Sequence, residues 1–217
     1  MSESTMTSMG ALNDGWGICG FTSTFYAMYR ANPATRGWLV NATEVYSVLY
    51  EICDYLKSIQ IENPKLVRDI EKFTRSFGGI FEDFEVASYI TRVETLSEGT
   101  RQILAFGSED FRSSHDAALR KHSPFSIAMP PQAIVDYIER LWKWKATLTE
   151  FTSASFSDDA IVGVRNKTRK DMKMYHGLCH YLYRGNGQYY SWGRSFPSLQ
   201  AANPDYEICY AITIRKY

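Results

Sequence analysis

NDGWGICGFTS, residues 13–23, combines a glycine-rich turn with the start of an apolar run. The run extends over residues 21–29 with the spacing of a helix. Cys19 therefore lies at the expected start of that helix, where the positive end of the helix dipole favours a thiolate. The glycines permit a tight turn and the close approach of another chain. This pattern indicates a nucleophilic thiol at Cys19.

An amide side chain, Asn13, lies six residues before Cys19. Together with the backbone N–H of Cys19 it can stabilise an oxyanion. The alternative is that Asn13 and Asp14 only cap the turn. A nucleophilic cysteine also needs a base, and two histidines lie late in the chain, at His176 and His180. A period of two places both on one face of a strand, so both remain candidates.

The composition is that of a folded globular protein, with 217 residues of which 45% are hydrophobic and 15% aromatic. The 24 basic residues balance the 24 acidic ones, so no net charge favours nucleic acid or an anionic membrane. The four cysteines form no CxxC pair, which argues against a zinc ribbon or a thioredoxin-type site. We therefore expect reduced thiols, no metal and no cofactor.

Residues 1–12 have neither the basic start nor the apolar core of a secretory signal. The sequence contains no apolar window of about 18 residues, so we expect no membrane span. These features predict synthesis in the cytoplasm, with any export carried out by a dedicated secretion system.

Apolar spacing predicts helices in the first two thirds of the chain. One covers about 43–61 with Thr43 as its N-cap, and Asn63-Pro64 starts another that ends at Gly78-Gly79. Residues 82–106 are expected to be helical in part, and a further helix follows Pro130-Pro131.

Aromatic and branched residues predict strands at 172–183, 188–194 and 206–217, with a hairpin turn at residues 185–187. The basic run 165–173 is interpreted as a solvated loop, with recognition of an acidic partner as the alternative. We expect an α+β fold in one domain, 1–217, with a helical part at about 15–150 and a sheet part at about 160–217.

The expected hairpin carries a second motif, Tyr190-Ser191-Trp192-Gly193. A turn centred on Asn186 places His180 opposite Ser191 or Trp192, and His176 opposite Ser195 or Phe196. An early cysteine at a helix start, a late histidine on a strand and this motif on the next strand resemble the papain-like cysteine proteases, whose corresponding motif is Asn-Ser-Trp-Gly.

The resemblance implies a papain-like fold with Cys19 as nucleophile, His176 as base and Asn13 as the second oxyanion donor. Tyr190 stands where the family has its orienting asparagine, so Ser191 or Ser195 is expected to accept a hydrogen bond from the histidine instead. The resemblance covers about twelve residues at the front and about twenty at the back, and residues 31–160 carry no motif of the family.

The function implied is a thiol hydrolase that acts on an amide or peptide bond. Small chains with this layout resemble bacterial effector toxins with protease activity, which implies a protein or peptide substrate and either a cognate immunity protein or a secretion machinery as partner. Cleavage of the peptidoglycan stem peptide is a second possibility. The non-enzymatic alternative is a binding module in which Cys19 is merely packed at a helix start.

Overall fold

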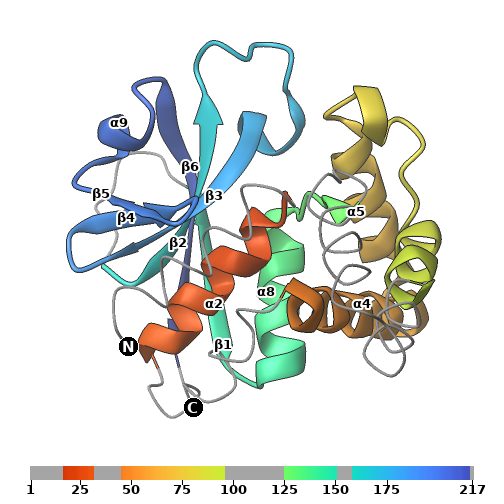
Figure 1. Ribbon diagram of the computed structural model, residues 1–217. Coiled ribbons are helices and arrows are strands. Elements are labelled where there is room, and N and C mark those ends of the chain that lie inside the picture. Colours follow the sequence, from red (N-terminus) through yellow and green to blue (C-terminus); the bar gives the residue numbers. More distant parts are fainter. Residues whose placement is uncertain (1–16, 32–44, 96–124, 151–157, 216–217) are drawn as a thin grey trace, which may run out of the picture.

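The computed structural model describes residues 17–31, 45–95, 125–150 and 158–215. Helices from the first part of the chain pack against a six-stranded sheet formed by the last part (Figure 1). The main helices are α2 (Cys19–Ala31), α4 (Val45–Glu62), α5 (Pro64–Arg75) and α8 (Pro131–Trp142). Residues 86–95 are also helical, and shorter helical turns are η2 (Gly79–Phe81), η4 (Met174–Gly177) and α9 (Leu199–Ala202).

The sheet is antiparallel throughout, in the order β1-β6-β2-β3-β4-β5. Its strands are β1 (Lys145–Glu150), β2 (Ala160–Asn166), β3 (Leu178–Gly185), β4 (Gln188–Ser191), β5 (Arg194–Phe196) and β6 (Tyr206–Arg215). The α+β class expected from the sequence is therefore confirmed.

The helix boundaries follow the local signals in the sequence. Asn63 caps α5, since its side chain accepts a hydrogen bond of 3.2 Å from the N–H of Leu66, and Pro64 fills the first helical position. Helix α8 likewise begins at Pro131. The expected N-cap Thr43 lies outside the described residues.

Two strand predictions and one loop prediction were wrong in part. The strand expected from residue 172 begins only at Leu178, because Tyr175 and His176 have positive φ angles of 49° and 57°, which extended strands exclude. The segment 188–194 is two strands, because positive φ at Trp192 and Gly193 folds it into a second hairpin. The basic run 165–173, interpreted as a loop, begins inside β2.

The apolar strand β2 was not among the predicted strands. Strand β1 was not predicted either, so the sheet begins at Lys145 rather than near residue 160. The burial of β1 alternates weakly because it pairs only with β6, at the edge of the sheet. A short edge strand that carries mostly polar residues gives little apolar alternation to detect.

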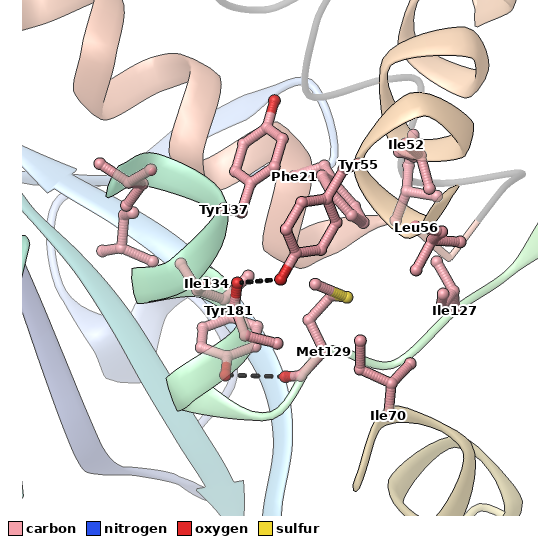
Figure 2. Close-up of a cluster of buried hydrophobic side chains, with 14 of the residues drawn as sticks. Phe21, Ile52, Tyr55, Leu56, Ile70, Ile127, Met129, Ile134, Tyr137 and Tyr181 are labelled. Carbon is pink, nitrogen blue, oxygen red and sulfur yellow. Dashed lines mark hydrogen bonds between the residues drawn. The ribbon is translucent and has the colours of Figure 1, made fainter. Parts of the chain in front are cut away.

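The main core lies between the sheet and the helices, with α2 at its centre. The ring of Phe21 meets the edges of Tyr137 and Tyr55, with centroids 5.0 Å and 6.4 Å away. Figure 2 shows these rings together with two hydrogen bonds, from the hydroxyl of Tyr55 to the Ala133 carbonyl at 3.0 Å and from that of Tyr181 to the Met129 carbonyl at 2.9 Å. Buried hydroxyls thus fix the chain before and inside α8 against α4 and β3.

A second, smaller cluster covers the other face of the sheet, beneath α9. His180 is buried here, with its ring stacked on Trp192 at a centroid distance of 4.4 Å and its Nε2 2.7 Å from the Oγ of Ser191. Burial lowers the pKa of His180 to about 3. The imidazole is therefore neutral in the folded protein at neutral pH.

The tip of the β3–β4 hairpin is connected to the C-terminal end of α2. Arg30 donates a hydrogen bond to the side-chain oxygen of Asn186, and its Nε lies 3.6 Å from a carboxylate oxygen of Asp159. The hydroxyl of Tyr183 donates to the same carboxylate. The positive φ angles of Asn186 and Gly187, 52° and 71°, form a two-residue turn within the hairpin turn predicted at residues 185–187.

Replacing Tyr181 by Phe should lower the free energy of unfolding by about 1–3 kcal/mol, because the Met129 carbonyl would stay buried without its donor. Chemical denaturation of both proteins measures this difference. Tyr189→Phe is the matched control, since the Tyr189 hydroxyl has no hydrogen bond within the described part of the chain, and it should change stability by less than about 0.5 kcal/mol. Equal effects of the two substitutions would contradict a stabilising hydrogen bond from Tyr181 to the Met129 carbonyl.

Acid should destabilise the protein through His180. The ordinary pKa of histidine is 6.5, so below that pH His180 is protonated in the unfolded chain. In the folded chain the same side chain stays neutral down to about pH 3. Stability should fall through this window by up to about 4 kcal/mol from this group alone. Urea denaturation at pH 7 and pH 4 should show a smaller loss of stability for His180→Gln than for the wild type. If His180→Gln lost as much stability between pH 7 and pH 4 as the wild type, His180 would not be the source of the acid sensitivity.

Candidate functional site

Cys19 is the first residue of α2, as the sequence predicts, and the chain that leads to α8 lies against this helix start. The Gly17 carbonyl accepts a hydrogen bond of 3.3 Å from the N–H of Ile127. Gly17 has a φ of 58°, and a Cβ atom there would lie 2.4 Å from the Oγ of Ser126. Glycine is thus required at residue 17 both for its backbone angle and for this close approach.

The Cys19 thiol is half-buried and protonated at neutral pH. Desolvation raises its pKa to about 11, and hydrogen bonding to the backbone of Tyr181 opposes that rise only in part. Among the described residues, no hydrogen bond or ion pair joins Cys19 to a histidine, lysine or arginine. The helix dipole alone therefore does not produce a thiolate here.

His176 lies in η4, immediately before β3, and its side chain is 57% exposed. Its Nε2 is 3.6 Å from a carboxylate oxygen of Glu150, and its ring centroid is 5.7 Å from that of Tyr210. Cys19 lies close to the backbone of Tyr181, inside β3. The structure thus pairs His176 with Glu150, and among the described residues no hydrogen bond or ion pair joins His176 to Cys19.

His180, the alternative base, faces the second cluster on the side of the sheet opposite to α2. Ser191 is its partner, at the distance given above, so the contact expected between a histidine and this serine is present. It joins His180 rather than His176, however. Both side chains are buried, and neither lies on the face that carries Cys19.

A β-bulge explains why the two histidines differ in environment. The register between β2 and β3 shifts between Val164 and Arg165, so that Val164 pairs with His180 and Arg165 with Leu178. One residue of β3, Cys179, is therefore left without a partner residue, and the alternation of faces breaks there. The period-two argument for a common face fails at this bulge, and His176 lies outside the strand altogether.

Asn13, the expected second oxyanion donor, lies outside the described residues. The N–H groups of Phe21 and Thr22, in the first turn of α2, donate to the Ile18 carbonyl at 3.0 and 3.1 Å. The N–H of Cys19 belongs to those that a helix leaves without a partner inside itself. It is the part of the predicted oxyanion site that falls within the described part of the chain.

Sequence reasoning missed Glu150 and Tyr175. Glu150 ends β1, a strand that the sequence did not reveal, and only the pairing of β1 with β6 brings it to His176. Tyr175 contributes to a cavity of about 380 Å³ between η4, the start of α5 and the start of α8. No local signal marks these residues, because their contacts join segments that are distant in sequence.

Within the described ranges, no three histidine, cysteine, aspartate or glutamate side chains gather in a way that could hold a metal ion. The same residues include no helix that is both long and apolar enough to cross a membrane. The four cysteines are present as free thiols.

Comparisons with protein-family models, curated proteins and solved structures gave no match to this chain. The papain-like resemblance therefore rests on the motifs around Cys19 and Ser191.

Proposed function

We propose that this chain is a thiol hydrolase that cleaves or modifies an amide or peptide bond, with Cys19 as its nucleophile and His176 as its base. The observation that carries the proposal is the position of Cys19 at the first residue of α2, with that helix packed against β3 and His176 two residues before the same strand. A papain-like fold, beyond the α+β class, is part of this proposal.

The chemistry assigns one role to each group. His176 takes the thiol proton, and the Cys19 thiolate attacks the carbonyl carbon of the substrate. The N–H of Cys19 and the amide of Asn13 stabilise the resulting oxyanion, each donor contributing about 3 kcal/mol. The imidazolium then gives its proton to the leaving amine, and water hydrolyses the thioester to regenerate the thiol.

In this proposal Glu150 takes the place of the expected orienting residue. Its carboxylate faces Nε2 of His176, which leaves Nδ1 for proton transfer. Catalysis requires η4 to carry the imidazole towards Cys19. The consecutive positive φ angles of Tyr175 and His176 are costly for residues other than glycine, and a movement of η4 that removed them would recover part of that cost.

A binding module without catalysis is the second candidate, and one observation favours it directly. Desolvation holds Cys19 as a neutral thiol that no histidine contacts within the described residues. A cysteine in such an environment behaves as a small apolar residue.

The reactivity of Cys19 distinguishes the two candidates. If Cys19 and His176 form a catalytic pair, iodoacetamide should label Cys19 at pH 7 at least about tenfold faster than Cys53 or Cys209, and His176→Ala should abolish the difference. Mass spectrometry of tryptic peptides measures each rate. His180→Ala is the matched control, because it removes a histidine from the opposite face of the sheet and should leave the rate at Cys19 unchanged.

A Cys19 that is labelled only as the pH approaches 11, with or without His176, would refute the hydrolase and leave the binding module. Rates that respond equally to His176→Ala and His180→Ala would indicate a general loss of structure rather than a catalytic pair.

The substrate class is tested by expression of the chain in bacterial cells. A protease or other protein-modifying effector should arrest growth when made in the cytosol, and Cys19→Ser should relieve the arrest. An enzyme directed at the peptidoglycan stem peptide should act only when it is delivered to the periplasm. Toxicity that Cys19→Ser leaves unchanged would contradict both forms of the proposal.

A further inference from the structure

A cavity of about 380 Å³ opens between α5, the start of α8 and η4. Its apolar lining consists of Leu66 and Pro130, which are both buried, and the half-buried ring of Tyr175. That ring packs edge-to-face with Phe73 at a centroid distance of 4.9 Å. The cavity therefore has an apolar floor, to which an aliphatic stem can pack.

The polar part of the lining includes a carboxylate, Asp69, and an ammonium, Lys65. These groups are 3.6 Å apart, but the Lys65 side chain is 82% exposed whereas that of Asp69 is only 32% exposed. An ion pair of this kind between residues four apart on a helix surface is worth about 0.3–0.5 kcal/mol. Asp69 is thus the positioned charge of the cavity, and Lys65 is a weakly held counterion that a ligand can displace.

Two helix starts border the cavity, yet neither is suited to an anion. Both α5 and α8 have proline at their first position, Pro64 and Pro131, so each lacks one of the N–H groups that would bind an anion. The Leu66 N–H is already bonded to the side chain of Asn63. The available chemistry therefore favours a cation.

We infer that this cavity binds the side chain of an arginine residue in a peptide or protein partner. The methylene stem lies on Leu66 and Pro130, and the guanidinium bonds to the Asp69 carboxylate and meets the Tyr175 ring. A planar guanidinium makes both contacts better than an ammonium does, since it pairs with a carboxylate through two N–H groups and stacks on aromatic rings.

This inference goes beyond the proposed function, because binding needs neither Cys19 nor His176. Tyr175 nevertheless precedes His176 directly, so an arginine bound here would bring the neighbouring part of its chain to the candidate base. The experiment measures binding alone, so its result can be interpreted even if the catalytic proposal fails.

The test is a titration of the full chain with the peptides acetyl-Ala-Arg-Ala-amide, acetyl-Ala-norleucine-Ala-amide and acetyl-Ala-Glu-Ala-amide, followed by NMR chemical shifts. The arginine peptide should bind tightest, with shifts at Leu66, Gln132 and Tyr175, and Cys19→Ala should leave its affinity unchanged. Asp69→Asn should weaken binding about tenfold, the loss expected for one charge-assisted contact in a half-buried site.

Two further variants make the result specific. Asp54→Asn removes the same charge from an exposed position on α4 outside the cavity and should leave the affinity unchanged. Lys65→Gln frees Asp69 and should tighten binding of the arginine peptide about twofold, in proportion to the lost ion pair.

Three results would overturn the inference. Equal weakening by Asp69→Asn and Asp54→Asn would mean that only net charge matters. Preference for the glutamate peptide, together with weaker binding in Lys65→Gln, would make the cavity an anion site. Absence of any shift at the lining residues with millimolar arginine peptide would show that the cavity does not bind this side chain.

Discussion

Burial of α2 on all sides is the constraint on which the rest of the structure depends. Every described side chain from Gly20 to Met28 is buried, including the polar Thr22, Ser23 and Thr24. A helix with no solvated face must be enclosed by other elements, and α2 lies between the sheet and α8, as Figure 1 shows. Burial of Thr22 and Thr24 is possible because both donate their hydroxyl hydrogens to carbonyls of the preceding turn.

The same burial determines the state of Cys19. A helix dipole stabilises a nearby anion by roughly 0.3–1 kcal/mol. The net rise in the Cys19 pKa from 9.0 to about 11 corresponds to about 3 kcal/mol in the opposite direction. Desolvation is therefore the larger effect, and a thiolate at this position needs a cation close to it. His176, which we propose as the base, is instead paired with Glu150 in the described structure.

The sheet separates the two histidines into different chemical environments. His180 lies in an aromatic cluster that excludes water and keeps the ring neutral, which suits a structural role beside Ser191 and Trp192. His176 lies at the end of the sheet among exposed polar groups, next to the cavity that contains Asp69 and Tyr175. The exposed polar side chains in this part of the molecule therefore lie around η4, where the backbone leaves the extended conformation.

The sequence by itself determined those features that depend on neighbours along the chain. The start of α2 at Cys19, the capped start of α5 and the turn at Asn186-Gly187 each follow from local backbone preferences, and all three are present. Tertiary structure alone decided the edge strand β1, the positive φ angles at Tyr175 and His176, and the bulge that disturbs the alternation of faces in β3. It also decided that His176 meets Glu150 and that Ser191 meets His180. These outcomes depend on which strands pair and on which side chains are buried between the layers. Both depend on residues that are distant in sequence, so the spacing of residues along the chain does not predict them.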